Sequence, residues 1–462
     1  MSVQKNSKDY TMNMCEGSIL NKLLLFALPL IASSVLQLFF NAADVIVVGK
    51  FAGDHALAAV GSNGSIINLL VNVFMGLSVG ANVLVARFFA AKQEKELRKT
   101  VHTAMTVSVL CGIFVAIMGT LAARLVLTLM QSPPEVIDLS TLYLRIYFMG
   151  MPATMAYNFG AAILRAAGDT KRPLYILAIS GVVNVVLNLF CVIVLKLGVV
   201  GVAIGTIASQ IISAIAVIVI LVRTKSEFRL NLFALSIHRR QILKVAATGI
   251  PSGINGIMYS LSNVIIQTAI NSFGKIAIAG NVVASNIEVF GFLILSSVEQ
   301  GVVTFVGQNM GAGKLNRVDS VTKVSLCTAF IGAGAFALMM IFWGRFLLGF
   351  FADEASREAV VNAAMLKMSV VIYSFILHVP NQVLGGVLKG MGRAVVSMCI
   401  NIVFVCLLRV VWVFCVYPLN PTLKMIFYSY PVTWGLSSVA AIIAYIFVRR
   451  KVFGKEKSKA AS

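Results

Sequence analysis

Two stretches of the chain share one pattern, and this repeat decides the fold. The first reads LLLFALPLIASSVLQLFFNAADVIVVG (residues 23–49), and the second reads VAATGIPSGINGIMYSLSNVIIQTAI (residues 245–270). Prolines and asparagines recur 222 residues apart, at Pro29 and Pro251 and at Asn41 and Asn263. A solenoid unit is only about 20–50 residues long. The spacing therefore predicts two related half-proteins rather than a repeat array.

The composition is that of an integral membrane protein. Hydrophobic residues make up 59% of the chain and charged residues 12%, and the mean hydropathy is +0.92. A soluble domain carries about 25% charged residues. Apolar runs that reach the ~20 residues needed to cross a bilayer recur along the whole length. We predict an all-α fold with twelve transmembrane helices, at residues 19–49, 56–86, 101–130, 138–164, 173–195, 198–222, 240–272, 276–307, 320–351, 361–388, 395–418 and 423–448.

The net charge of +21 has an explanation in the membrane topology. Basic residues collect at cytoplasmic ends of spans because their translocation is unfavourable. If the N-terminus is inside, seven segments face the cytoplasm and hold 28 of the 38 Lys and Arg residues. We therefore expect a multi-pass protein of the inner (plasma) membrane with both termini cytoplasmic. The same asymmetry explains the charge without a nucleic-acid partner.

Each half contains six predicted spans. An even number returns the chain to its starting side, so both halves enter the membrane in the same orientation. This arrangement predicts parallel repeats related by an axis along the membrane normal. The expected parts are a cytoplasmic tail (1–18), an N-lobe of spans 1–6 (19–222), a basic amphipathic linker at the cytoplasmic surface (223–241), a C-lobe of spans 7–12 (242–448) and a basic cytoplasmic tail (449–462).

No motif in the sequence indicates an enzyme. Gly76-Leu-Ser-Val-Gly80 has the spacing of a hydrolase nucleophile elbow, but it lies in an apolar helical run rather than at a strand-to-helix turn. Gly311-Ala-Gly-Lys314 departs from a phosphate-binding loop, because leucine follows the lysine. The seven cysteines form no metal-like cluster. We expect no catalytic residues, no cofactor and no metal beyond a coupling ion, so active transport would use an ion gradient.

Polar residues in the first half point to a cation site. Asp44 lies in the first span, and a carboxylate at mid-bilayer costs several kcal/mol, so it normally has a function. Asn41 is one turn earlier on the same face. Asn184 and Asn188 share one face of span 5, and their amide oxygens are able to coordinate a cation. The alternatives are a solvated Asp44 at the outer helix end and plain interhelical hydrogen bonds from the asparagines.

Polar residues in the second half gather in spans 8, 10 and 11. Glu288 and Glu299 are nearly three turns apart in one span, so both are able to face one cavity. Arg409 is a plausible counter-ion for one of them, and a structural ion pair is as plausible as a working site. His378 adds polar lining to span 10, although a lone histidine in such a span is more often a satisfied core residue.

Two further features are duplicated. Pro29 and Pro251 each remove a helix hydrogen bond, so we predict a bend at the same place in both repeats. Leu164-Arg-Ala-Ala-Gly168 and Leu388-Lys-Gly-Met-Gly392 each place a basic residue and a glycine at a helix end. That pattern predicts a left-handed helix cap, which is a structural role.

At these residues the chain resembles the MATE family of multidrug exporters. The matching pieces cover essentially the whole chain: Pro29…Asn41-Ala-Ala-Asp44-Val…Val48-Gly49, Ala56-Leu-Ala-Ala-Val60-Gly61, Leu164-Arg165-Ala-Ala-Gly168-Asp169-Thr170 and Gly307-Gln308-Asn309-Met-Gly311-Ala312-Gly313. The resemblance implies two six-helix bundles around a central cleft. It also implies antiport of drugs against H⁺ or Na⁺.

The resemblance implies cation-site roles for two residues and shows two positions at which this chain departs from the family pattern. Asp44 matches the family's N-lobe cation-site aspartate, and Asn184 matches its span-5 asparagine. Asn188 falls where many members have aspartate, so one carboxylate of that site is missing. Tyr259 stands where one branch has an acidic C-lobe residue, which leaves Glu288 as a possible substitute.

We therefore predict a secondary active exporter, acting as a monomer, for amphipathic and cationic small molecules. The cation-binding set is Asp44, Asn184, Asn188 and Asn41, with Na⁺ at Asp44 as the one possible metal. The predicted substrate cleft is lined by spans 1, 2, 7 and 8, with Gln37, Tyr259, Asn263, Glu288, Glu299 and His378 in contact with substrate. The expected partners are small-molecule substrates and membrane lipid. The alternatives are a flippase for a lipid-linked substrate, which the scarcity of intramembrane arginines disfavours, and a receptor or channel without coupled transport.

Overall fold

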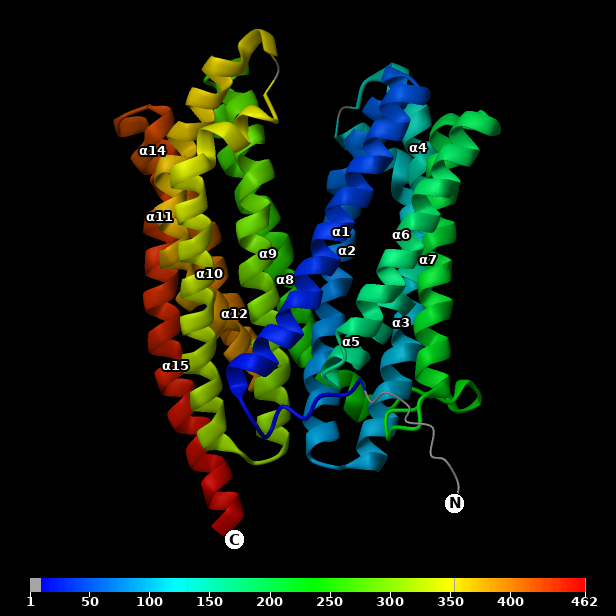
Figure 1. The fold of residues 1–462 in the computed structure, drawn as a ribbon, viewed down its shortest axis with the longest axis vertical. Coiled ribbons are helices and arrows are strands. Elements are labelled where there is room, and N and C mark those ends of the chain that lie inside the picture. Colours follow the sequence, from blue (N-terminus) through cyan, green and yellow to red (C-terminus); the bar gives the residue numbers. More distant parts are fainter. Residues whose placement is uncertain (1–9, 131, 353, 462) are drawn as a thin grey trace. The chain divides into compact units, whose positions relative to one another are not determined.

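The computed structural model describes residues 10–130, 132–352 and 354–461. Within these ranges the chain forms helices and no strand (Figure 1). Helices are the expected solution for an apolar chain in lipid, because each helix satisfies its own backbone hydrogen bonds. The all-α prediction is confirmed.

The first half contains seven α-helices, coloured blue to green in Figure 1. They are α1 (Ile19–Phe51), α2 (Asp54–Ala90), α3 (Glu94–Leu129), α4 (Pro134–Met149), α5 (Met151–Ala166), α6 (Lys171–Leu189), which continues as the π-helical segment η1 (Phe190–Val194), and α7 (Gly198–Arg223). The linker that follows carries one turn of 3₁₀-helix, η2 (Leu232–Ala234).

The second half begins with four long helices, broken only by the 3₁₀ turn η3 (Glu354–Ser356): α8 (Arg239–Asn271), α9 (Lys275–Gly311), α10 (Leu315–Gly349) and α11 (Arg357–Gly390). The eleventh span is irregular and consists of α12 (Ala394–Ile400), η4 (Asn401–Leu407), α13 (Leu408–Val411), η5 (Trp412–Val416) and η6 (Tyr417–Leu419). The last span is α14 (Leu423–Phe427) with α15 (Ser429–Ala461).

The described helices account for all twelve predicted spans. For ten of the twelve predicted spans, the described helix is long and apolar enough to cross a membrane, and the exceptions are the fourth and the seventh. The fourth predicted span is divided into α4 and α5 at Gly150, with Pro152 in the first turn of the second piece. The seventh is α8, which is less apolar because polar residues interrupt it, Asn255 among them. The twelve-helix fold in two six-span repeats is thereby confirmed.

The duplication is also visible in the backbone. Left-handed residues occur at matching turns of the two halves: Gly53 (φ 87°) and Gly274 (φ 86°), Lys92 (φ 53°) and Gly313 (φ 69°), and Gly168 (φ 89°) and Gly392 (φ 77°). The last pair closes α5 and α11 with the same hydrogen bonds, in which Asp169 N donates to Leu164 O and Arg393 N to Leu388 O. These bonds satisfy carbonyls that a helix end leaves free. The predicted left-handed caps are confirmed.

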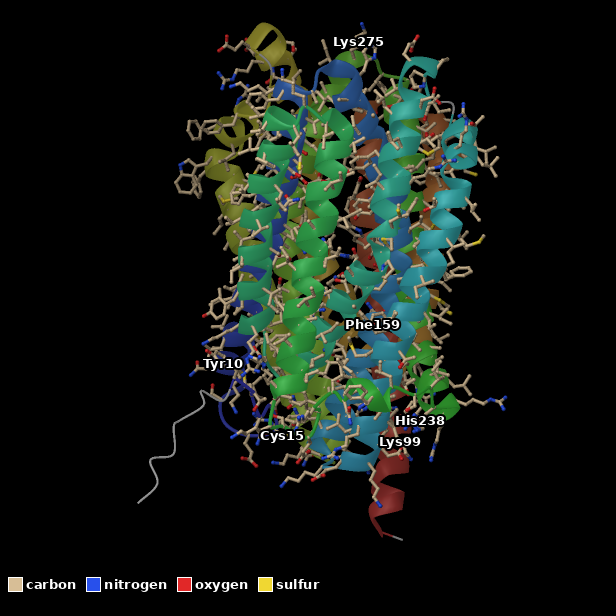
Figure 2. The ribbon with its side chains drawn as sticks, turned by 90° about the vertical axis from the view of Figure 1, so that its right-hand side faces the viewer. Tyr10, Cys15, Lys99, Phe159, His238 and Lys275 are labelled. Carbon is tan, nitrogen blue, oxygen red and sulfur yellow. The ribbon has the colours of Figure 1, made fainter. Side chains whose placement is uncertain are left out.

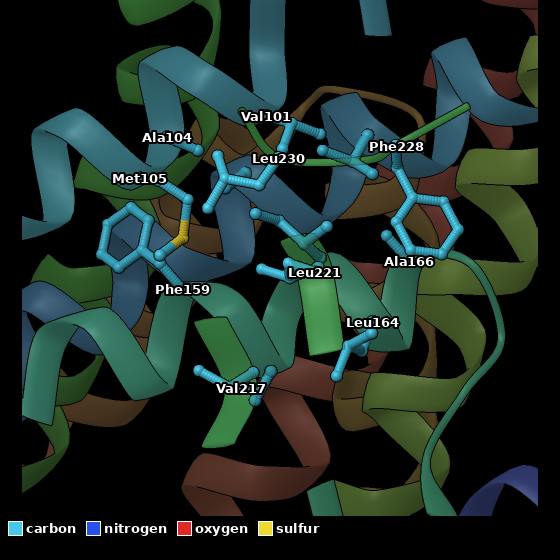
Figure 3. Packing of buried hydrophobic residues seen from close by; sticks show 14 of the residues in the cluster. Val101, Ala104, Met105, Phe159, Leu164, Ala166, Val217, Leu221, Phe228 and Leu230 are labelled. Carbon is cyan, nitrogen blue, oxygen red and sulfur yellow. The ribbon is translucent and has the colours of Figure 1, made fainter. Parts of the chain in front are cut away.

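The chain divides into two compact units. The first consists of Met1–Gly17 and Leu24–Val245, and the second of Ser18–Leu23 and Ala246–Ser462. The linker therefore belongs to the first unit, and its side chains show why. Phe228 and Leu230 are fully buried in a core formed with α2, α3, α5 and α7 (Figure 3).

The rest of the linker lies against one end of α3. Asn231 N donates to the His102 ring, and Thr103 Oγ1 donates to Ser236 O. His238 and Lys99 lie at this same end of the first unit (Figure 2). Four large apolar side chains of the linker are exposed, namely Leu232, Phe233, Leu235 and Ile237. This pattern is typical of a segment whose apolar side chains enter a membrane surface.

Candidate ion and substrate sites

The polar cluster of the first unit joins α1 to α6. Asn188 donates from Nδ2 to Asp44 Oδ1 at 2.5 Å, and the same group lies 3.5 Å from Asn184 Oδ1. Both asparagines are buried, and Asp44 is half-buried. Asp44 lies on α1 and both asparagines lie on α6. The hydrogen bond between Asp44 and Asn188 therefore joins residues that are 144 positions apart in the sequence. Asp44 is therefore a hydrogen-bonded carboxylate rather than a fully solvated one.

Helix α7 completes the surroundings of this cluster. Asn184 Nδ2 lies 3.5 Å from Thr206 Oγ1, and Thr206 donates to Val202 O at 2.9 Å. The Oδ1 atom of Asn188 is buried and accepts no hydrogen bond. A methyl group added at Gly205 would lie 2.1 Å from that oxygen. Glycine at this position is thus what lets Asn188 lie beside α7 while it reaches Asp44.

The arrangement suits the neutralisation of one negative charge. Asp44 is acceptor-only when ionised, so Asn188 presents its amide N–H₂ to it. If a proton or a metal cation neutralises the carboxylate, the amide is able to turn its free oxygen toward it. Asp44, Asn184, Asn188 and Thr206 then offer carboxylate, amide and hydroxyl oxygens, the ligand type preferred by hard cations. Among the described residues, no group of three or more His, Cys, Asp or Glu gathers to hold another metal.

The remaining predicted residues of α1 lie apart from this cluster. Asn41 and Gln37 are exposed, and neither forms a hydrogen bond with Asp44. Asn41 is on the same helical face as Asp44, but Asn188 from α6 approaches the carboxylate instead. Pro29 and Pro251 lie inside α1 and α8, which continue on both sides of them. The bend at these prolines stays a prediction.

The two glutamates of α9 have separate partners in the second unit. Glu288 Oε1 lies 3.0 Å from Lys367 Nζ of α11, with side chains only 8% and 2% exposed. Glu299 Oε1 lies 2.6 Å from Lys389 Nζ, and Glu299 Oε2 accepts a hydrogen bond from Gln382 Nε2. The expectation that Arg409 is a counter-ion for one of them is wrong. A lysine of α11 is already within reach of each carboxylate, Lys367 in the first third of the helix and Lys389 at its C-terminal end.

A cavity of about 230 Å³ lies within the second unit. Of the predicted substrate residues, Tyr259, Asn263 and Glu288 line it, whereas Glu299 and His378 do not. Glu299 lies eleven residues further along α9, about 16 Å at ~1.5 Å per residue, and pairs with Lys389, so the two glutamates do not share this cavity. His378 is buried in an aromatic group and stacks on Trp434 with ring centroids 4.7 Å apart. That packing makes His378 a core residue, but its Nδ1 atom is buried without a hydrogen-bond partner, so it is not the satisfied histidine that such a position usually holds.

The MatE family model matches residues 29–190 and 251–415, one segment in each half. Together these segments cover more than two thirds of the sequence. The chain belongs to the MatE family, the multidrug and toxic compound extrusion transporters. Both the cluster at Asp44 and the residues that line the second-unit cavity up to Arg409 lie within the matched segments.

Several named relatives support this membership. The chain is 27% identical over 399 residues to the probable multidrug resistance protein YoeA of Bacillus subtilis, covering 85% of this chain and 86% of the relative. It is 22% identical over 391 residues to the probable multidrug resistance protein NorM of Thermotoga maritima, covering 83% of each chain.

Solved structures share the fold. An outward-facing multidrug resistance MATE family transporter of the MOP superfamily matches with a TM-score of 0.86 at 20% identity, covering 95% of this chain and 97% of that one. A MATE structure described as being in the bent conformation matches with a TM-score of 0.87 at 19% identity, covering 97% and 98% of the two chains.

Sequence reasoning missed two participants in this MatE chain. Thr206 lies next to Asn184, but a threonine in an apolar span gives no signal beyond a possible helix-backbone bond. Lys367 lies within the tenth predicted span and received no role from the sequence, yet it is 1% exposed and also donates to Ser285 Oγ at 2.9 Å. The signal available for Lys367 was Glu288 itself, because a buried carboxylate requires a partner.

The Lys367–Glu288 pair of the MatE chain makes a testable contribution to stability. Lys367→Met leaves the Glu288 carboxylate buried without a cation, and we expect it to destabilise the fold by about 3–5 kcal/mol. Thermal unfolding in detergent measures the effect. The exposed Arg124–Asp138 pair is the control, because Arg124→Met is expected to cost no more than about 1 kcal/mol. Equal costs for both variants would contradict the buried pairing.

Proposed function

We propose that the chain is a secondary active exporter that moves amphipathic, cationic drugs outward in exchange for H⁺ or Na⁺. The supporting observation is the single carboxylate Asp44, held by the amide of Asn188 in the first unit. The names of the relatives, which refer to multidrug resistance, support drugs as the substrate class. In this proposal the chain is a transporter rather than an enzyme and acts as a monomer in the plasma membrane, with both termini cytoplasmic.

The coupling follows from the charge of Asp44. An ionised carboxylate attracts a lipophilic cation, and a proton or Na⁺ removes that attraction when it binds. Neutralisation also removes the acceptor for the Asn188 amide, so the link between α1 and α6 changes with ion occupancy. Pro29 removes one backbone hydrogen bond from α1, so the helix is able to bend there when the ion binds. One charge thereby controls both substrate attraction and helix shape.

The remaining polar residues have secondary roles in this proposal. Asn41 and Gln37 are exposed on α1 and extend the polar surface near Asp44 toward a substrate. Asn184 and Thr206 hold Asn188 in position from α6 and α7. The domain boundaries of the proposal follow the two lobes at 19–222 and 242–448, joined by the linker 223–241.

Flux in reconstituted proteoliposomes tests the function. An imposed gradient of H⁺ or of Na⁺ is applied separately, and uptake of a fluorescent lipophilic cation is followed against its own gradient. We expect concentrative movement with one of the two ions and none without a gradient. Movement that only equilibrates the dye under both gradients would contradict antiport and favour an uncoupled pathway. Movement of a lipid-linked substrate in place of the dye would favour a flippase.

A further inference from the structure

The cavity in the second unit carries a net positive charge. Its ionisable lining groups are Glu288, Lys367 and Arg409, together with the phenols Tyr259 and Tyr430. Lys367 and Glu288 neutralise each other at 3.0 Å. Arg409 remains, and its guanidinium carries one positive charge. The cavity therefore contains one cation more than it contains anions.

Arg409 lacks a carboxylate partner among the described residues. Its side chain is 1% exposed, and Nη1 donates to two neutral acceptors, Ser262 Oγ at 3.2 Å and Asn263 Oδ1 at 3.3 Å. The guanidinium also lies 4.4 Å from the centre of the Tyr430 ring. Its Nε atom is buried and donates to no acceptor. A buried cation with a free donor is unfavourable unless an anion completes its surroundings.

A second free donor belongs to the same cavity. Trp434 is 1% exposed and lines the cavity, and its Nε1 atom is buried without an acceptor. The Arg409 guanidinium lies 5.8 Å from the Trp434 ring. Buried N–H groups in native proteins are nearly always paired with protein, water or ligand. Arg409 Nε and Trp434 Nε1 are thus two unpaired donors in one cavity, where Tyr259 Oη and Asn281 Oδ1 also have no hydrogen-bond partner, so the cavity has polar groups placed to meet a ligand.

The repeat shows that neither the Asp44 charge nor the Arg409 charge is duplicated in the other unit. With the 222-residue spacing of the first spans, Asp44 corresponds to Ile266, which lines the cavity. With the 224-residue spacing of the later loops, Arg409 corresponds to Val185, next to Asn184. Arg409 also lies on α13, a single turn between the π-helical segments η4 and η5. Such segments are frequent at functional sites.

We infer that this cavity binds the carboxylate of a small organic anion, held by the Arg409 guanidinium and the Trp434 indole. Its volume of about 230 Å³ lies below the ~300 Å³ at which pockets for drug-sized ligands begin. A planar carboxylate suits a guanidinium donor, and tyrosine rings offer an apolar wall for the remainder of the ligand. This site is separate from the proposed cation site at Asp44 and does not depend on it.

Binding of benzoate and of its neutral analogue benzamide provides the test. Equilibrium dialysis of the purified full-length protein in nanodiscs, in buffer without halide or other carboxylates at pH 7.5, measures both ligands without an ion gradient. We expect benzoate to bind at one site and benzamide at least ~10-fold more weakly, because a hydrogen bond to a charged group is worth more than one to a neutral group. Similar affinity for the two compounds would overturn the inference.

Variants locate the site. Arg409→Gln is expected to abolish benzoate binding, and Trp434→Phe, which keeps the ring but removes the donor, is expected to weaken it at least ~10-fold. The matched control is Trp412→Phe, because Trp412 Nε1 already donates to Met425 O at 2.9 Å and does not line the cavity. If Arg409→Gln does not fold, Trp434→Phe decides the question. Unchanged binding in folded Trp434→Phe would overturn the assignment.

Discussion

Replacing Asp44 with asparagine is expected to abolish gradient-driven transport while the protein still folds. The change preserves shape but removes the only carboxylate of the cluster with Asn184 and Asn188. A neutral amide neither binds a proton at physiological pH nor changes charge on meeting Na⁺. Uphill dye movement in proteoliposomes should fall to the level of empty vesicles under either gradient.

A matched aspartate separates this effect from a general loss of charge. Asp138 on α4 is 78% exposed and pairs with Arg124 at 3.3 Å at the protein surface. We expect Asp138→Asn to transport at the wild-type rate, because a surface ion pair contributes little to stability. Normal pumping by Asp44→Asn would place the coupling group elsewhere in the chain and refute the proposed mechanism.

The fold was largely predictable because a bilayer imposes a length and a polarity on every span. The third predicted span, 101–130, lies within α3 (Glu94–Leu129) apart from its last residue, and the sixth, 198–222, differs from α7 by a single residue. The break at Gly150 and the π-helical segments of the eleventh span were not foreseen. A hydropathy pattern reports apolar length, and it contains little information on how the backbone winds within that length.

The sequence allowed us to predict which residues form the candidate ion site, but not which of them contact one another. Asp44 and Asn188 stood out because polar groups are costly in lipid, but their direct bond depends on how α1 packs against α6. The same limit explains the error at Arg409. Its expected partner was a glutamate, yet α11 brings Lys367 to Glu288 and leaves the arginine with neutral acceptors. Sequence spacing within one helix does not determine which neighbouring helix supplies the counter-ion.

The second large effect is expected from Gly205→Ala, a change that adds one methyl group. The new Cβ would lie 2.1 Å from Asn188 Oδ1, so the amide must move away from α7. Asn188 is fully buried and bonded to Asp44, which leaves it little room to move without losing that contact. Overpacking of this kind costs about 1–3 kcal/mol of stability. We expect transport to fall at least ~10-fold, as measured by dye flux in proteoliposomes.

A double variant tests whether the clash with Asn188 is the cause. Asn188→Ala removes the atoms that the new methyl group would meet, so Gly205→Ala combined with Asn188→Ala should be more stable than the sum of the two single changes implies. Transport by the double variant should stay low, because the amide that holds Asp44 is missing. Gly64→Ala is the control, since a methyl group there meets no atom of the described side chains within 4 Å. Purely additive stability changes would show that Gly205 acts through something other than Asn188.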